Sequence, residues 1–441
     1  MRAMKDSGIE WIGRIPENWA TPPLRSKYSF GKGLAITKAD LADDGAPVIS
    51  YGQIHAKDNI GVAVRDTLIR YLPLDHSSLT ESSKTESGDL IFADTSEDVQ
   101  GCGNCVYIDR KESIYAGYHT LILRPKVKGL GRYYAYLFAS DAWRSQVRAN
   151  VAGVKVYSIT QDILKKTILL EPPSEEQEGI VAFLDAKCSE IDSLIAAKEK
   201  TNALLKERRQ SLIYEAVTKG LDATVPMKDS DTEWLGMIPE TWSTWRMKHL
   251  AKMPLQYGAN ATGIEYEKGL PRYVRITDIT DERQLSHEGK QSLPIEIAAD
   301  YMLSDGDILF ARSGATSGKS YYYQAEDGEC CFAGYLICFR ADKSKVNSKL
   351  LYYFTLTQAY EQWTQQIFIQ ATIQNISAEK YNNLVFAIPA TMEEQDQIVT
   401  YLDQRCAEID RMIRKNADAV TKLKEYRQSL IYEVVTGKIE V

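Results

Sequence analysis

Several features that mark membrane proteins and secreted proteins are missing from this sequence of 441 residues. No run approaches the roughly 18 consecutive apolar residues of a membrane helix, and no basic segment followed by an apolar one opens the chain. The seven cysteines are odd in number and scattered, which is typical of reduced thiols and not of a disulfide framework. We therefore expect a cytoplasmic protein with no membrane partner.

The signatures of common catalytic sites are also missing. There is no G-x-x-x-x-G-K-[ST] loop and no H-E-x-x-H motif, and the Gly-rich loop and [DNS]-P-P-[YFW] turn of a DNA methyltransferase are absent. The "CGNC" at Cys102 is a lone C-x-x-C with no second pair and no nearby histidine, which disfavours a metal site. We therefore expect a non-enzyme with no catalytic, cofactor or metal residues of its own.

Basic charge is scarce as well. The net charge is −7, and even the first 173 residues hold only 22 Lys and Arg against 20 Asp and Glu, while the rest of the chain is net acidic. Because phosphate binding normally demands a basic face, any contact with DNA has to come from local patches or with the help of partner subunits.

What is present is a tandem duplication. Residues 175–219 align without a gap onto 393–437 with 24 identities in 45 positions, and "MKDSGIEWIGRIPENWAT" from Met4 matches "MKDSDTEWLGMIPETWST" from Met227. Between these anchors "GDLIFADTS" from Gly88 corresponds to "GDILFARSG" from Gly306. The order is lobe, helix, lobe, helix, with predicted boundaries at residues 1–173, 174–222, 223–391 and 392–441.

The repeated 45 residues have the pattern of a coiled-coil helix. Apolar positions recur at alternating steps of four and three for more than four heptads, from Leu184 to Ala216 and from Leu402 to Val434. A helix of this length measures roughly 68 Å at 1.5 Å per residue, so it cannot be buried in one lobe. We expect the two helices to pair antiparallel about a pseudo-two-fold axis. Lys198, Asn202 and Asn416 either fix the register of this seam or lie where it meets solvent.

The lobes are predicted to be α+β domains of roughly 150 residues. Short runs rich in branched and aromatic residues predict strands, among them "PVISYGQI" at Pro47, "TLILRP" at Thr120 and "RYVRITDI" at Arg272. Tyr-rich helical patterns follow from Gly131 and from Lys349. Two unlike lobes on matched arms predict a protein that places one lobe on each of two DNA half-sites.

Taken together, these motifs resemble a known family. The four-part plan, the opening "EWLGxIPxxW", the phrase "GDILFARSGATSGK", the helix entry "EEQ…IVxxLD" and the ending "RQSLIYEVVTGKI" resemble the specificity subunit of type I restriction–modification systems. The resemblance covers essentially the whole chain. The first lobe is the looser fit, because "GDLIFADTSED" lacks the arginine and the Gly-Ala-Thr run found at 312–316.

The resemblance implies that each lobe is a target-recognition domain for one half of a bipartite, asymmetric sequence in double-stranded DNA. It implies two modification (methyltransferase) subunits docked on the helices, joined by restriction (motor-nuclease) subunits. S-adenosylmethionine would be bound by the modification subunits and not by this chain. The duplicated "RQSLIYE" would then serve two identical subunits, with Tyr214 and Tyr432 at the subunit interface. The alternative is that both tyrosines cap the coiled coil internally.

Polar side chains on glycine-rich loops are the candidates for contact with DNA, because base readout needs hydrogen-bonding groups on a backbone that can approach closely. In the second lobe the predicted DNA-binding residues are Tyr257, Asn260, Thr262, Arg275, Thr277, Arg312, Ser313, Thr316, Lys319, Gln370, Thr372 and Gln374. In the first lobe they are Lys32, Lys38, Tyr51, Gln53, Thr95, Ser96, Lys155 and Tyr157. Placement in a solvated loop or at a strand edge is the alternative for each of them.

Two other functions compete with this hypothesis. A scaffold that assembles subunits through its lobes and coiled coil, without binding DNA, agrees with the acidic balance and predicts no salt-dependent affinity for DNA. A self-contained DNA methyltransferase would bind S-adenosylmethionine alone, which the missing cofactor motifs disfavour.

Overall fold

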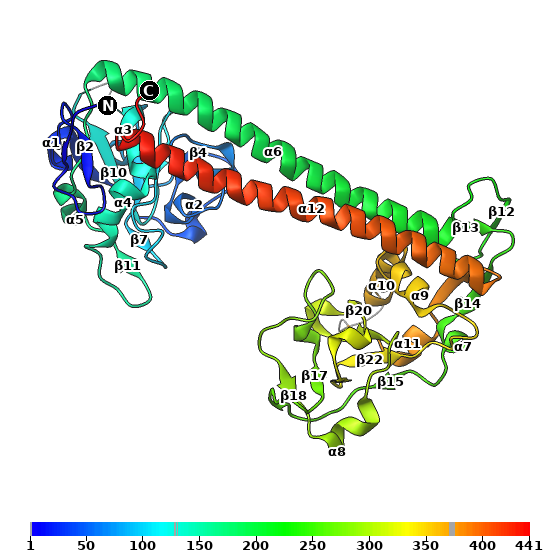
Figure 1. Cartoon of the computed structure of the whole chain (residues 1–441). Coiled ribbons are helices and arrows are strands. Elements are labelled where there is room, and N and C mark those ends of the chain that lie inside the picture. The colour runs from blue at the N-terminus through cyan, green and yellow to red at the C-terminus, as the bar shows by residue number, and fades with distance from the viewer. Residues whose placement is uncertain (1, 128, 130, 370–374) are drawn as a thin grey trace. The chain divides into compact units, whose positions relative to one another are not determined.

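The computed structural model describes residues 2–127, 129, 131–369 and 375–441. It divides into two compact units, each of which contains one lobe and parts of both long helices. The first unit comprises Met1–Lys198 and Asp418–Val441, and the second comprises Glu199–Ala417. The long helices are α6 (Ser174–Lys219) and α12 (Met392–Val435), which lie side by side in each unit (Figure 1).

The lobe of the first unit is built on a four-stranded antiparallel sheet in the order β3-β10-β6-β8. A three-stranded sheet in the order β5-β4-β9, which contains the parallel pair β4 and β9, completes the lobe with two strand pairs, β1-β2 and β7-β11. The strands are β1 (Met4–Asp6), β2 (Arg14–Pro16), β3 (Tyr28–Lys32), β4 (Ala46–Ile49), β5 (Arg70–Leu72), β6 (Leu90–Ala93), β7 (Thr95–Ser96), β8 (Cys105–Tyr107), β9 (Tyr115–Ala116), β10 (Thr120–Pro125) and β11 (Tyr157–Ser158). The helices are α1 (Leu24–Lys27), α2 (Tyr51–Ile54), α3 (Gly131–Ala139), α4 (Asp141–Arg148) and α5 (Gln161–Lys166).

The lobe of the second unit repeats this plan. Its antiparallel sheet has the order β15-β22-β19-β20, and a second sheet in the order β16-β18-β17-β21 contains the parallel pair β17 and β21. The strands are β12 (Met227–Asp229), β13 (Met237–Pro239), β14 (Ser243–Arg246), β15 (Gln256–Tyr257), β16 (Ile264–Glu265), β17 (Arg272–Val274), β18 (Gln291–Ser292), β19 (Ile308–Ala311), β20 (Ser320–Tyr322), β21 (Cys330–Phe332), β22 (Leu336–Phe339) and β23 (Val385–Ile388). The helices are α7 (Met247–Leu250), α8 (Ile295–Ala298), α9 (Ser348–Phe354), α10 (Gln358–Ile369) and α11 (Ala378–Asn382).

The heptad pattern is confirmed by the packing of the long helices. In the first unit Leu184 and Ile191 of α6 share a core with Val420 and Val434 of α12, so the helices run antiparallel. Leu184 and Leu402, which are equivalent in the duplication, are both 0% exposed. Removing a leucine side chain from water contributes roughly 1.5–3 kcal/mol, so each buried leucine of the seam stabilises the pairing of the helices.

The two asparagines of the seam are paired across it and not simply solvated. The Asn416 amide donates from Nδ2 to Asn202 Oδ1 (3.1 Å), and Asn202 Nδ2 donates to the carbonyl of Ile413 (3.2 Å). Both asparagines are half-buried. Half-buried amides that bond across the seam favour one register of the two helices, which agrees with the first of the two alternatives for Asn202 and Asn416.

Identical residues of the duplicated helices make equivalent contacts in both units. The indole of Trp19 donates to Glu176 (3.1 Å), and the indole of Trp242 donates to Glu394 (2.8 Å). These tryptophans end the two "IPxxW" motifs, so the motif attaches each lobe to the first turn of a long helix, where acidic side chains are favourable.

The ion pairs between the long helices are also equivalent in the two units. Asp192 pairs with Arg427 in the first unit (3.3 Å), and its duplicate Asp410 pairs with Arg209 in the second (3.0 Å). The duplication is therefore visible in ion pairs as well as in sequence.

Some local predictions differ from the structure. The single helix expected from Gly131 is two helices, α3 and α4, and the pattern from Lys349 is likewise split into α9 and α10. The strand expected from Pro47 ends at Ile49 and is followed by α2.

Candidate nucleic-acid interface

In the first lobe, residues from four separate segments lie where strands of the antiparallel sheet end. Lys32 ends β3, Asp94 follows β6, and His119 precedes β10. The Asp94 amide donates to the His119 carbonyl (3.1 Å), and the amide after Ser158 donates to the Asp94 carbonyl (2.7 Å). We call Lys32, Asp94, His119 and Ser158 the strand-end edge of the first lobe.

The second lobe has the same edge. Tyr257 ends β15, Arg312 follows β19, and Tyr335 precedes β22. The Arg312 amide donates to the Tyr335 carbonyl (3.0 Å), and the amide after Asn375 donates to the Arg312 carbonyl (2.9 Å). Tyr257, Arg312, Tyr335 and Asn375 form the strand-end edge of the second lobe. The backbone frames match position by position, whereas the side chains differ at all four positions.

Among the predicted residues of the second lobe, Arg312 and Tyr257 are brought together. The guanidinium carbon lies 4.8 Å from the centroid of the Tyr257 ring, which is cation–π geometry. The Tyr257 hydroxyl accepts a hydrogen bond from the Ala378 amide (2.9 Å), so the ring is held in place. Arg312 Nε is buried and has no partner among the described residues. Ser313 forms a β-bridge with Asn375 at the same edge.

Two other basic residues predicted in this lobe are engaged in ion pairs. Arg275 makes two hydrogen bonds to Asp278 (2.8 and 3.0 Å), and this pairing raises the pKa of its guanidinium. Lys319 Nζ donates to Asp281 (2.7 Å), which lowers the pKa of that carboxyl. These partners leave Arg275 and Lys319 less available to DNA than Arg312 is.

The remaining predicted residues of the second lobe lie around this edge or beyond it. Asn260, Thr262 and Thr277 are exposed, and Thr316 is half-buried with a hydroxyl that has no partner among the described residues. Gln370, Thr372 and Gln374 lie outside the described residues.

In the first lobe, a cavity of about 600 Å³ borders the strand-end edge. Predicted residues Tyr51 and Ser96 line it, together with other polar groups: His55, Glu97, Asp98, Gln100, Asn104 and Arg144. His55 Nε2 lies 2.8 Å from the Thr95 carbonyl and must donate to it, so Nδ1 accepts from the Asn104 amide (3.0 Å). The pKa of Arg144 is lowered, first by burial and then by the neighbouring Arg148.

The other predicted residues of the first lobe do not line this cavity. Lys32, Lys38 and Lys155 are exposed, whereas Gln53 and Tyr157 are half-buried. The Gln53 side chain accepts from the Ser50 amide (3.2 Å) and so completes a helix cap. Thr95 and Ser96 form β7, which pairs with Tyr157 and Ser158 of β11.

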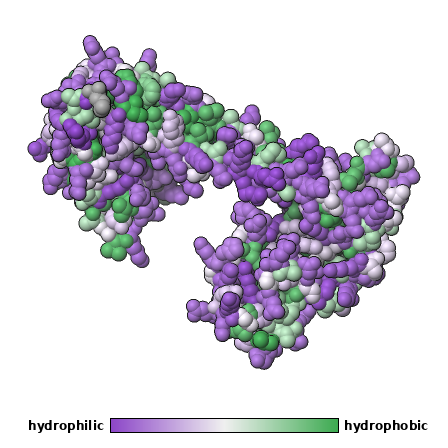
Figure 2. Space-filling model, viewed as in Figure 1, coloured by the Kyte–Doolittle hydropathy of each residue, from purple (hydrophilic) through white to green (hydrophobic). Residues whose placement is uncertain are grey.

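The loop before β11 projects from the lobe (Figure 1) and carries apolar side chains that sequence reasoning missed. Val154 is 94% exposed and Val156 is also exposed, on either side of Lys155. In the second unit, Ile295 and Ile297 of α8 are exposed. Most of the surface visible in Figure 2 is hydrophilic, with scattered hydrophobic residues.

Sequence reasoning also missed His119, Tyr335, His55 and Asn104. His119 follows "AGY" in the first lobe, and Tyr335 follows "AG" in the second. Both lobes repeat this turn, and the repetition was the signal that could have identified the two residues. No local signal marks His55 or Asn104, because the pairing of distant strands brings them together.

Tyr214 and Tyr432 occupy equivalent places at the ends of the long helices. Each is half-buried against the core of its own unit. The Tyr432 hydroxyl donates to the Trp11 carbonyl (3.2 Å) and accepts from Lys438 (2.9 Å), and Lys219 lies 6.0 Å from the Tyr214 ring centroid. Their role as a subunit interface stays a prediction.

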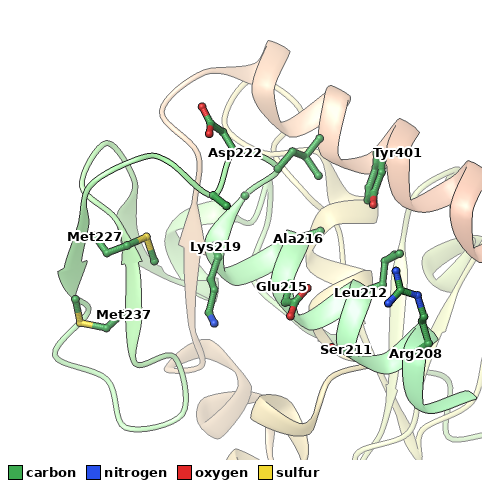
Figure 3. Close-up of a pocket in the computed structure, with 13 residues that line it drawn as sticks. Arg208, Ser211, Leu212, Glu215, Ala216, Lys219, Asp222, Met227, Met237 and Tyr401 are labelled. Atoms are coloured by element: carbon green, nitrogen blue, oxygen red, sulfur yellow. The ribbon is translucent and has the colours of Figure 1, made fainter. Parts of the chain in front are cut away.

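A second pocket, of about 660 Å³, lies in the second unit beside the end of α6 (Figure 3). Met227 and Met237 of the β12–β13 hairpin face it from one side, α6 contributes Glu215 and Lys219, and Tyr401 comes from α12. Lys219 and Met237 align with Gly437 and Arg14 in the other half of the duplication. The lining is therefore not repeated.

Groups of the kind that hold a metal are missing from the described part of the chain, where no three His, Cys, Asp or Glu side chains gather at one place. All seven cysteines are free and buried, and burial raises the pKa of Cys105 to about 12 and that of Cys406 to about 11. Within the same described residues, no helix is both long enough and apolar enough to cross a bilayer.

Comparison with known families identifies the class of this protein. Residues 16–206 and 239–418 match the family described as the type I restriction modification DNA specificity domain, and the chain belongs to that family. It is a specificity subunit of a type I restriction–modification system, which is a non-catalytic subunit that acts on DNA within a complex.

The similar relatives are specificity subunits too. The StySPI specificity subunit of Salmonella potsdam is 23% identical over 97% of this chain and 90% of its own length. The EcoKI specificity subunit of Escherichia coli strain K12 is 20% identical over 97% of this chain and 90% of its own length.

Two solved structures share the fold. One, from a study described as "Structural basis underlying complex assembly and conformational transition of the type I R-M system", has a TM-score of 0.70 at 17% identity, covering 96% of this chain and 99% of that one. The HsdS subunit from Thermoanaerobacter tengcongensis has a TM-score of 0.50 at 18% identity, covering 96% of this chain and 98% of its own. The expected family and the expected α+β fold with two lobes and two long helices are confirmed.

Proposed function

We propose that this chain recognises a bipartite, asymmetric sequence in double-stranded DNA, with one lobe on each half, and that it docks two adenine methyltransferase subunits and motor-nuclease subunits in the cytoplasm. The observation that carries the proposal is the pair of strand-end edges. Two domains that recognise different base sequences need the same backbone arrangement with different side chains. Side-chain contacts with the bases determine sequence specificity, whereas the shared backbone only sets where those side chains lie.

The proposal assigns direct base readout first to Arg312. A guanidinium stacked on an aromatic ring retains N–H groups that match the O6 and N7 acceptors of guanine, and such a contact contributes about 1–3 kcal/mol of discrimination. The exposed Lys32, Lys38 and Lys155 are assigned to phosphates, which supply affinity without sequence information.

Docking of identical subunits requires identical surfaces on both units. The run from Arg209 to Glu215 recurs unchanged from Arg427 to Glu433, and Tyr214 and Tyr432 lie within it. The unrepeated pocket beside α6 does not meet this condition. The modification subunits would bind S-adenosylmethionine, and this chain would decide where they methylate.

The DNA half of the proposal is tested by sequencing the methylome of a host that expresses this chain with its neighbouring modification subunit. Methylated adenines are expected in a split motif that disappears when this chain is omitted. Methylation of the same motif by the modification subunit alone would refute the proposal.

The docking half is tested by native mass spectrometry of the assembled complex. Tyr214→Ala and Tyr432→Ala are each expected to lower occupancy by one modification subunit. Tyr426→Ala is the matched control, because Tyr426 is an exposed tyrosine of α12 that aligns with Arg208 and is not duplicated. Equal losses for all three variants would contradict the assignment.

A further inference from the structure

The two lobes carry opposite charges at the same position of the strand-end edge. Asp94 follows β6 and Arg312 follows β19, and both positions are fixed by the same two backbone hydrogen bonds. We propose that Asp94 is a specificity-determining residue of the first lobe, and that it accepts a hydrogen bond from the exocyclic amine of a base. This inference rests on the proposed function and names the chemistry of one half-site.

One oxygen of Asp94 is used to orient the carboxylate. Oδ1 accepts from the Thr95 hydroxyl (2.7 Å) and lies 3.2 Å from His119 Nδ1. Oδ2 has no hydrogen-bond partner among the residues that the structure describes, and 32% of the side chain is exposed. The carboxylate is therefore held by one atom and presents the other as an acceptor.

The neighbours of Asp94 make a contact with a base chemically reasonable. His119, which contacts Asp94, has its ring centroid 5.5 Å from that of Tyr51, and Tyr51 lines the adjacent cavity together with Arg144. A carboxylate is repelled by phosphate, so it is suited to the base edges. The donors available in the major groove are the N4 amine of cytosine and the N6 amine of adenine.

Arg312 has the reverse polarity. A guanidinium has five donors and no acceptor, so it recognises base acceptors such as O6 and N7 of guanine. With aspartate in place of arginine at the same backbone position, the lobe would recognise amine donors of the bases and not acceptors. The two lobes would then differ in the atoms that they read and not only in the bases.

Single-atom base analogues test the proposal in the assembled complex of this chain with its modification subunits. The bipartite target is first taken from the methylome, and duplexes are then made with one analogue each. Deoxynebularine removes the adenine amine, the pyrimidin-2-one nucleoside removes the cytosine amine, and 7-deazaguanine removes N7. Affinity is measured at one fixed salt concentration for wild type, Asp94→Ala and Arg312→Ala. Glu97→Ala is the control, because Glu97 is an exposed carboxylate three residues from Asp94 that lines the neighbouring cavity.

For wild type, removing the amine at one position of one half-site is expected to weaken binding about 5- to 150-fold. Asp94→Ala abolishes that penalty, whereas Glu97→Ala retains it. A 7-deazaguanine penalty in the other half is abolished only by Arg312→Ala. If Asp94→Ala leaves every amine penalty unchanged, the inference is wrong although the proposed function stands. If wild type binds no bipartite target, the proposed function fails first.

Discussion

Each unit is expected to lose stability separately when its part of the helical seam is damaged. Leu184 in the first unit and Leu402 in the second are equivalent and fully buried. Replacing either by alanine removes buried methyl groups and leaves a cavity, which costs roughly 2–5 kcal/mol. Leu194 and Met412, each 46% exposed on the same helices, are matched controls, for which alanine is expected to change stability by less than about 0.5 kcal/mol.

Hydrogen–deuterium exchange with mass spectrometry locates the loss. A destabilisation of about 2–5 kcal/mol speeds exchange through opening by roughly 30- to 5,000-fold. For Leu184→Ala, the faster amides are expected in the first unit, including residues 418–435 of α12, because these pack against the damaged part of α6. Residues 392–417 of the same helix keep their wild-type rates.

Leu402→Ala is expected to give the complementary pattern. Equal acceleration along the whole of α12 in both variants would show that the long helices open as single elements. That result would refute the division into two units with their own cores.

Three further predictions concern the contacts that hold each unit together. Trp242→Phe removes a hydrogen bond to a carboxylate and is expected to lower the free energy of unfolding by about 1.5–3 kcal/mol in urea, whereas the exposed Trp245→Phe changes it little. Gly437→Ala places a Cβ 2.4 Å from a proline ring at a φ of +68°, so its melting temperature falls, while Gly52→Ala has open space and serves as the control. Because burial raises the pKa of Cys406 to about 11, this thiol stays protonated at pH 8 and is expected to resist Ellman's reagent until denaturant is added.

The long helices could be predicted from the sequence because their signal is local. Leu184 to Ala216 repeats every seven residues, and a glycine with positive φ ends each helix, Gly220 after α6 and Gly437 after α12. The strand after Pro47 was predicted too long because a capping box formed by Ser50 and Gln53 turns the chain into α2, and tertiary structure decides where such a turn is used.

The candidate site was only partly predictable for a related reason. Arg312 belongs to the motif "GDILFARSGATSGK", which carries the family resemblance. Asp94 was noted only as the position where the first lobe lacks that arginine. Its partner His119 and its neighbour Ser158 are distant in sequence and are brought together by β pairing. Local patterns carry no information about which distant loops meet, so the strand-end edges emerge only from the fold.

The most direct test of the central claim compares methylomes from hosts that express the modification subunit with wild-type chain or with the Arg312→Ala variant. If this chain is a reader with two different lobes, the wild-type motif is split and asymmetric, and the variant relaxes one or more bases in one half only. A motif that does not depend on this chain, or a variant that relaxes both halves equally, would contradict the account.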